Sequence, residues 1–180
     1  YSPSIVGNLS STVRKYVLLG SARAFSLVPD RRAEDCRVAE RAVRESGVTW
    51  TVLHPTVIYG GEGGGGAIDR LVSLVRRWEI IPLPRGGRAL MQPILIDDVV
   101  SSLAAALDRS EAESKTIVLA GPRAMWLSDV VRICARLLER RVTVLPIPLW
   151  IARGLEGLER FFPGLAHGYD GEILRISEEK

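Results

Sequence analysis

The chain of 180 residues is 47% hydrophobic and 25% charged, a composition typical of globular proteins that excludes a disordered or fibrous chain. Its net charge of +3 comes from arginines spread through predicted helices, so solvated helix faces explain the charge better than a nucleic-acid site. The two cysteines fall in helical patterns without partners at metal-ligand spacing. We therefore expect reduced thiols, a cytoplasmic location and no metal site.

No segment has the length and apolarity of a membrane span. Residues 142–152 form an apolar run near the C-terminus, but the run is broken twice by proline and is about half as long as a bilayer requires. The first residues lack the basic start and apolar core of a signal peptide. We expect a protein without a membrane span.

The first half of the chain predicts a strand, a helix and a second strand. Residues 15–22 form a continuous apolar run that ends in small residues, which is typical of a short buried strand. Asp30 is a candidate N-cap for a helix in which Cys36, Ala39 and Val43 recur at helical spacing. Residues 49–60 then form a buried strand without polar alternation, as a parallel strand covered on both faces requires.

The second half continues the same alternation. A glycine-rich loop precedes a helix over residues 67–78, and a connection broken by prolines leads to a strand and helix over 93–110. A third strand over 116–121 is followed by a helix over 127–141, a short extended piece and an amphipathic closing helix. Strands that alternate with helices predict an α/β fold with a parallel sheet and right-handed crossovers.

Four stretches resemble the extended and atypical short-chain dehydrogenase/reductase family, the NAD-dependent epimerase and dehydratase group. They are KYVLLGSA, similar to the strand that ends at the family's active-site serine or threonine; AERAVRESGVTWTVLHPTVIYG, similar to its helix, strand and RPxxxYG turn; QPILIDDVVSSLAAAL, similar to its VHVDDVA helix start; and TIVLAGP, similar to its last strand. The resemblance covers nearly all of residues 15–122.

The resemblance implies only the C-terminal portion of the family's fold: a partial, Rossmann-like parallel sheet with crossover helices, plus a C-terminal substrate-side helical segment. On this basis we expect residues 1–122 to belong to an NAD(P)-binding domain and residues 123–180 to the substrate side. Family members begin with a glycine-rich phosphate turn on a first strand and helix, and nothing before Lys15 matches that unit. We expect NAD or NADP in the complete protein and no tight binding by this chain alone.

A literal GxGxxG pattern occurs at Gly61, Gly63 and Gly66, between a predicted strand and a predicted helix. The loop is of low complexity, however, and no clean strand ending in a ribose-binding acid follows it. A flexible substrate-side loop is therefore the better interpretation.

The family's catalytic pair is missing from the sequence. Family enzymes move a proton through a tyrosine whose pKa is lowered by a lysine four residues later, and this chain has no Tyr-x-x-x-Lys. Arg32 and Cys36 stand at the corresponding positions, and an arginine with a pKa above about 12 does not release a proton near neutral pH. Ser21 occupies the position of the active-site serine or threonine, although a local backbone bond explains it equally well.

Further site residues follow from the resemblance. His54 replaces the arginine of the family's RP turn, as a structural histidine or as a cofactor contact; Pro55, Thr56, Val57 and Ile58 would line the nicotinamide side. Met91 and Gln92 lie on the substrate side, where Met91 replaces the arginine that grips a nucleotide-sugar diphosphate, so an apolar small-molecule substrate is favoured. Asp97 and Asp98 fit the start of a helix better than an acid pair.

Three functions remain open for this sequence. The first is an NAD(P)-dependent oxidoreductase or epimerase of unusual mechanism. The second is a non-catalytic dinucleotide-binding accessory or regulatory protein, and the third is an inactive fragment with an exposed sheet edge. The choice between NAD and NADP, the substrate and a homodimer are left open.

Overall fold

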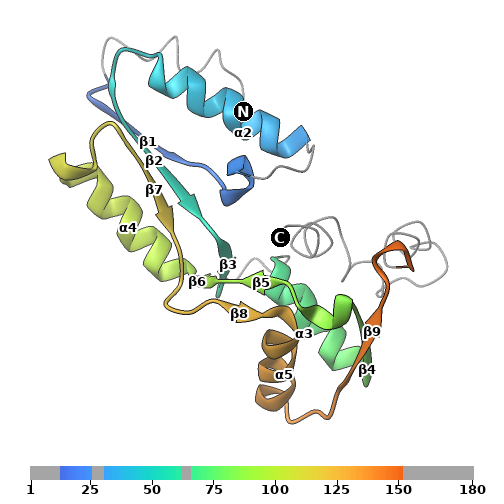
Figure 1. The fold of residues 1–180 in the computed structure, drawn as a ribbon. Helices are drawn as coiled ribbons and strands as arrows, with labels where there is room; N and C mark the ends of the chain where they lie inside the picture. Colours follow the sequence, from blue (N-terminus) through green and yellow to red (C-terminus); the bar gives the residue numbers. More distant parts are fainter. Residues whose placement is uncertain (1–12, 26–30, 62–65, 152–180) are drawn as a thin grey trace. The chain divides into compact units, whose positions relative to one another are not determined.

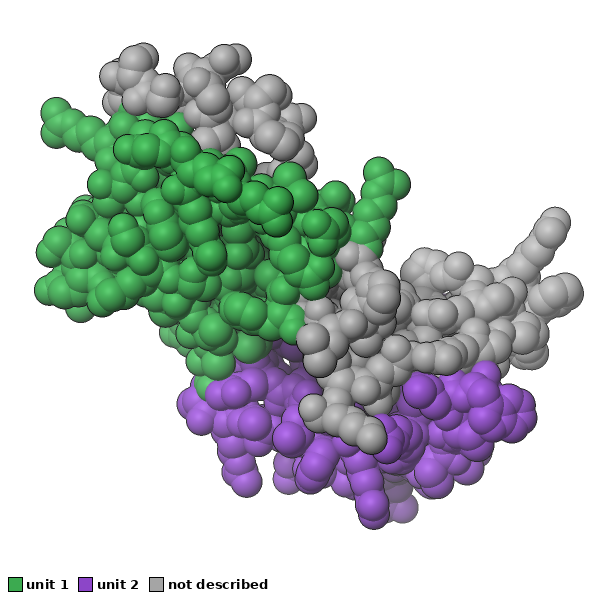
Figure 2. Space-filling view, turned by 45° about the horizontal axis from the view of Figure 1, so that its top comes forward, with its two compact units in different colours: residues 1–56, 94–121 green, residues 57–93, 122–180 purple. Residues whose placement is uncertain are grey.

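The computed structural model describes residues 13–25, 31–61 and 66–151. The predicted N-cap Asp30, Gly63 and most of the closing helix lie outside the described residues. Within them the chain divides into two compact units, coloured separately in Figure 2: unit 1 contains residues 1–56 and 94–121, and unit 2 contains residues 57–93 and 122–180. The expected domain division at residue 122 remains a prediction for the complete protein.

Unit 1 is a three-stranded parallel sheet between two helices (Figure 1). The strands run in the spatial order β1-β2-β7, and helices α2 and α4 cover opposite faces of the sheet. The elements are β1 (Lys15–Leu19), the 3₁₀ turn η1 (Ala22–Phe25), α2 (Arg31–Arg44), β2 (Thr49–Pro55), β6 (Pro93–Leu95, of which Pro93 is counted in unit 2), α4 (Ile96–Asp108), η3 (Ser110–Ala112) and β7 (Lys115–Leu119). The predicted parallel sheet with crossover helices is therefore confirmed.

Strand β2 is the centre of this sheet. In the parallel register, Leu18 pairs with Val52 and Leu53 with Ile117. Most of β2 is buried, whereas every residue of β1 is only half-buried and β7 is largely exposed. Within the described part of the chain, β1 thus pairs along one edge only and leaves the other edge open.

Helix α4 begins as its sequence indicates. Asp97 and Asp98 lie in its first turn, where carboxylates oppose the positive end of the helix dipole. The N-cap residue is Leu95, without a side-chain cap, and both aspartates are exposed. Their role is therefore electrostatic, and the structure records no capping bond from either side chain.

Unit 2 is built from short strand pairs and two helices. Its elements are β3 (Val57–Tyr59), α3 (Ala67–Arg77), β4 (Ile80–Pro84), η2 (Arg85–Gly87), β5 (Leu90–Met91), β8 (Met125–Trp126), α5 (Leu127–Leu137) and β9 (Thr143–Ile147). Strands β4 and β9 pair in parallel, and β5 and β8 pair in antiparallel. The apolar faces of α3 and α5 share one core with β4, which includes Leu71, Leu83 and Val131.

The prediction that residues 80–84 belong to a proline-broken connection is wrong. These residues form β4, in which Pro82 faces Leu145 and Leu83 faces Pro146 across the β4–β9 pair. Proline is tolerated in such a strand because the pair has only two strands, and a missing N–H can point away from the partner. The predicted strand over residues 49–60 is likewise divided, into β2 and β3, at Thr56.

The turn that follows β4 packs closely against the start of α5. Gly87 has φ +72°, and a Cβ atom there would lie 2.6 Å from Leu83 Cδ1 and 2.9 Å from the Ser128 backbone nitrogen. Only glycine fits this position without displacing backbone. The adjacent Leu127 N–H donates to the Ala89 carbonyl at 2.8 Å, which ties the first turn of α5 to the β5 segment.

Candidate functional site

The carboxyl end of the unit 1 sheet is the edge where open α/β folds bind ligands. The ladder continues past the strand ends there: the Gly20 N–H donates to the Leu53 carbonyl at 2.8 Å, and the Thr56 N–H donates to the Leu119 carbonyl at 2.9 Å. Ser21, His54 and Pro55 consequently lie at this edge.

His54 fills the space below the end of β1. Its side chain is fully buried, and Nδ1 lies 2.7 Å from the backbone oxygen of Ser21. Because a carbonyl oxygen can only accept, Nδ1 carries the proton of this bond. The ring also packs against Phe25, with centroids 4.6 Å apart and an interplanar angle of 55°. His54 therefore joins β2 to the segment that follows β1.

Glu40 of α2 completes a polar cluster with His54. Its Oε1 lies 3.2 Å from His54 Nε2, and its Oε2 lies 3.5 Å from a guanidinium nitrogen of Arg44. The two atoms of the Glu40–His54 contact are buried and form no hydrogen bond. Arg44 in turn donates to Thr116 Oγ1 at 2.9 Å and lies 5.3 Å from the ring centroid of Trp50. The cluster thus joins α2 to β2 and β7.

The two central residues of this polar cluster are inaccessible to solvent. His54 is fully buried and Glu40 nearly so, and each is engaged by its neighbours. Of the two interpretations of His54, the geometry agrees with the structural one; a contact with the cofactor or substrate remains a prediction.

The positions of the missing catalytic pair lie on α2. Arg32 and Cys36 are one helical turn apart, and Cys36 is half-buried. Ser21 is half-buried immediately after β1, and its carbonyl is used by His54. The structure places Ser21 and Cys36 in the same unit, and their catalytic roles remain predictions.

The remaining predicted site residues are divided between the units. Pro55 and Thr56 belong to unit 1, whereas Val57 and Ile58 form part of β3 in unit 2. Of the substrate-side pair, which also lies in unit 2, Met91 is only 4% exposed and packs in the unit 2 core, and Gln92 is half-buried after β5. Their contacts with cofactor and substrate remain predictions.

The start of α3 is already occupied by a carboxylate of the chain. Asp69 Oδ2 accepts a hydrogen bond from the Gly66 N–H at 3.0 Å. A negative charge therefore lies where a dinucleotide turn would place a pyrophosphate, which disfavours a dinucleotide turn at this position.

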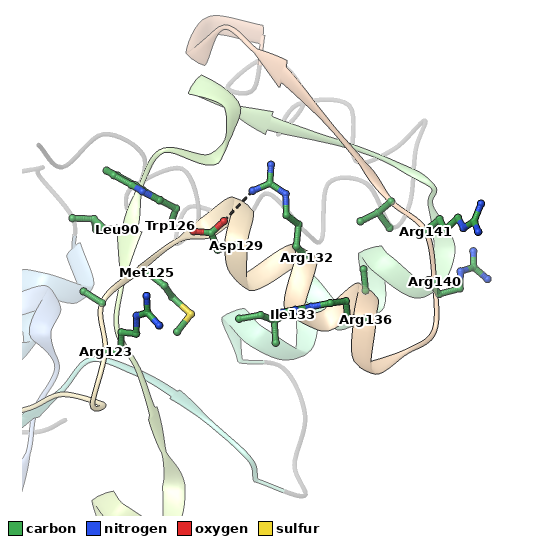
Figure 3. Close-up of a pocket in the computed structure, with 13 residues that line it drawn as sticks. Leu90, Arg123, Met125, Trp126, Asp129, Arg132, Ile133, Arg136, Arg140 and Arg141 are labelled. Carbon is green, nitrogen blue, oxygen red and sulfur yellow. Dashed lines mark hydrogen bonds and ion pairs between the residues drawn. The ribbon is translucent and has the colours of Figure 1, made fainter.

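A cavity of about 850 Å³ lies within unit 2 (Figure 3). Five arginines line it together with the apolar side chains of β5, β8 and α5: Arg123, Arg132, Arg136, Arg140 and Arg141. The arginines of residues 132–141 were expected on solvated helix faces, and their grouping at one cavity was not predicted. The clustering of four arginines within ten residues was the available signal.

The described residues contain no group of three or more metal-ligating side chains. Among the helices that the structure describes, none has the length and apolarity needed to cross a membrane.

Two curated relatives are similar to the chain in sequence. Both are named NADH dehydrogenase [ubiquinone] 1 alpha subcomplex subunit 9, mitochondrial. The protein from Arabidopsis thaliana is 24% identical over 157 residues, 84% of this chain and 38% of its own length. The protein from Dictyostelium discoideum is 25% identical over 121 residues, 67% of this chain and 33% of its own length. The chain therefore spans only about a third of these relatives. No family model matches it.

These relatives correct the expected location. Both carry the word mitochondrial in their names, so the cytoplasmic location inferred from two reduced cysteines was wrong. Cysteine usage separates oxidising from reducing compartments but does not distinguish one reducing compartment from another.

Solved structures show the same fold at low sequence identity. UDP-glucose 4-epimerase from Thermotoga maritima has a TM-score of 0.67 and 14% identity over 80% of this chain and 54% of its own. The Thermus thermophilus UDP-glucose 4-epimerase complex with NAD has a TM-score of 0.64 and 15% identity, and the match covers 80% of this chain and 55% of its own. Bacillus anthracis dTDP-4-dehydrorhamnose reductase in complex with NADP has a TM-score of 0.67 and 12% identity, and the match covers 81% of this chain and 55% of its own. The chain therefore has the Rossmann-like fold of NAD-dependent epimerases, dehydratases and related reductases, which confirms the resemblance seen in its motifs.

Proposed function

We propose that the protein is a non-catalytic, dinucleotide-binding accessory subunit of a mitochondrial NADH dehydrogenase, and that this chain is the C-terminal part of its Rossmann-like domain. The observation that carries the proposal is the absence of a Tyr-x-x-x-Lys pair from a chain whose fold is otherwise that of NAD- and NADP-binding enzymes. Without that pair, the usual proton transfer has no donor.

The polar cluster at the strand ends supports a structural role. In an enzyme, this edge presents a reactive group to the cofactor. Here His54 and Glu40 are buried against each other and tie α2 to the sheet. The similarity to complex subunits over 84% of the chain supports the choice of partner.

The open edge of β1 supports the proposal that further strands precede this segment. Every residue of β1 is half-buried, although inner strands of a parallel sheet are usually covered on both faces. A preceding half of the sheet, carrying the phosphate turn, would pair with this edge and complete the dinucleotide site.

Copurification tests the assembly role. The full-length protein, tagged in its own organism, is expected to comigrate with NADH dehydrogenase subunits on native gels after mild solubilisation of mitochondria. Migration of the tagged protein only as a free species, with no loss of assembled complex on its depletion, would contradict the role.

An NAD(P)-dependent oxidoreductase or epimerase of unusual mechanism is the second candidate. Ser21 at the expected position of the active-site serine favours it. This candidate predicts turnover of nicotinamide by the full-length protein and loss of that turnover in Ser21→Ala.

A further inference from the structure

The arginine-lined cavity of unit 2 has an apolar wall that is open to solvent. Leu90 of β5 and Trp126 of β8 are direct partners in the antiparallel pair, and they are 58% and 44% exposed. Ile133 of α5 and Met125 add to the same lining (Figure 3). A tryptophan and a leucine side by side at the surface form an amphipathic contact area of the kind found at membrane interfaces.

Arginines from three segments line the same cavity as this wall. Arg132 and Arg136 project from α5, Arg140 and Arg141 from the connection to β9, and Arg123 from the segment before β8 (Figure 3). All five are exposed.

The positive charge is largely uncompensated. Asp129, paired with Arg132 at 2.9 Å, is the one carboxylate among the described residues that line the cavity. The arginines therefore give the cavity an excess of positive charge, which favours an anionic ligand.

A second hollow extends the basic surface. It shares Trp126, Asp129 and Arg132 with the first and adds Arg85 and Arg88. Trp126 is thus common to two basic hollows. The surface thus combines arginine guanidinium groups, which are planar, forked donors for phosphate oxygens, with the exposed apolar side chains of Leu90 and Trp126.

We propose that this surface of unit 2 binds the phosphate headgroup of an anionic phospholipid, with the arginines on the phosphate oxygens and Leu90 and Trp126 against the acyl region. A soluble phosphate would use the charge alone and would leave the two exposed apolar side chains in water. A lipid uses both features, because anionic headgroups and acyl chains meet at the membrane interface. The inference is independent of the proposed function.

Vesicle cosedimentation of the full-length protein tests the site. Vesicles of phosphatidylcholine containing phosphatidylglycerol are expected to bind it, and pure phosphatidylcholine vesicles are not. Reversal of charge in Arg136→Glu/Arg140→Glu should weaken binding about tenfold or more. The matched control Arg76→Glu/Arg77→Glu makes the same change in charge on exposed residues of α3 that do not line the cavity, and should stay within about twofold of wild type.

The apolar wall has a separate test. Trp126→Ala is expected to weaken binding to the anionic vesicles several-fold, because the indole contact with the acyl region is lost. Glycerol phosphate, which carries the headgroup without acyl chains, should not displace the protein from vesicles at matched phosphate concentration. Circular dichroism confirms the fold of each variant, and Arg136→Ala/Arg140→Ala replaces the charge reversal if that variant does not fold.

Four results would overturn the proposal. Equal binding to neutral and to anionic vesicles would contradict a role for the arginines. A loss of binding in the α3 control as large as that in the cavity variant would show that only the overall charge of the protein matters. An unaffected Trp126→Ala variant would remove the apolar part of the site. Displacement of the protein from the vesicles by glycerol phosphate would assign the site to a soluble anion. Displacement by polyglutamate would assign it to an acidic protein.

Discussion

His54 Nε2 lies 3.2 Å from Glu40 Oε1, and both side chains are buried. This contact joins the end of β2 to the helix that carries the positions of the missing catalytic pair. The Arg44 guanidinium contacts the other carboxylate oxygen of Glu40, and the Ser21 carbonyl accepts from the other ring nitrogen of His54. Removal of either member of the pair therefore breaks two contacts, one of them buried.

His54→Leu is expected to lower the free energy of unfolding by about 2–4 kcal/mol, because the replacement has similar volume but removes the imidazole from the Ser21 carbonyl and from the buried Glu40 Oε1. Urea denaturation followed by circular dichroism measures the change. Glu34→Gln is the matched control, since it removes an exposed ion pair with Arg37 and should cost less than about 1 kcal/mol. Equal stability of His54→Leu and wild type would contradict the cluster's structural role.

Gly20 is required by the close approach of the His54 ring. A Cβ at residue 20 would lie 3.1 Å from His54 Cε1 and 3.2 Å from Nδ1, and the ring is held by its bond to the Ser21 carbonyl. Gly20→Ala should therefore cost about 1–3 kcal/mol. In the background of His54→Ala the same substitution should cost much less, and a double-mutant cycle measures the difference. Additive costs would show that the two residues do not interact.

Cys134 makes stability depend on pH in the alkaline range. Burial raises the pKa of the Cys134 thiol, against a smaller opposing effect of a backbone hydrogen bond. The folded state thus keeps the thiol protonated, whereas the unfolded state ionises above about pH 8.5. The free energy of unfolding contributed by this group is complete below that pH and falls as pH rises toward the folded-state pKa.

A comparison with Cys134→Ala isolates this effect. Under reducing conditions, the difference in unfolding free energy between wild type and Cys134→Ala should narrow between pH 8 and pH 10. A constant or widening difference would contradict a raised pKa.

Hydrogen exchange tests whether a preceding strand covers β1. In the full-length protein, the amides of β1 that do not bond to β2 are expected to exchange more slowly than in the 180-residue chain, because a parallel neighbour would accept from them. Amides of α5 in unit 2 serve as the internal reference and should exchange alike in both. Identical exchange rates for the β1 amides in the two proteins would contradict the proposal that a preceding strand pairs with β1.

Local sequence patterns predicted the elements that depend on local chemistry. The apolar runs of β1, β2 and β7 and the helical spacing of α2, α3 and α5 are visible in single segments, and the structure confirms these elements. The order of the resembling motifs was sufficient to indicate the fold, because the order and spacing of strands and helices define its topology.

Long-range pairings and surface groupings were not visible in the sequence. Strand β4 contains Pro82 and Pro84 and pairs with β9, which follows it by about 60 residues, so no local signal distinguished it from a loop. The cavity joins Leu90 and Arg123 to α5 only after β5 and β8 pair. The polar cluster has the same origin, because Glu40 and His54 meet only when α2 packs on the sheet.

Titration of NADH and NADPH into the full-length protein, followed by an assay of nicotinamide oxidation with quinone and ketone acceptors, distinguishes an accessory subunit from an enzyme. We expect saturable binding of one of the two dinucleotides without turnover above the rate in the absence of protein. Turnover that Ser21→Ala abolishes would contradict a non-catalytic role, and absence of binding by either dinucleotide would contradict the dinucleotide-binding role.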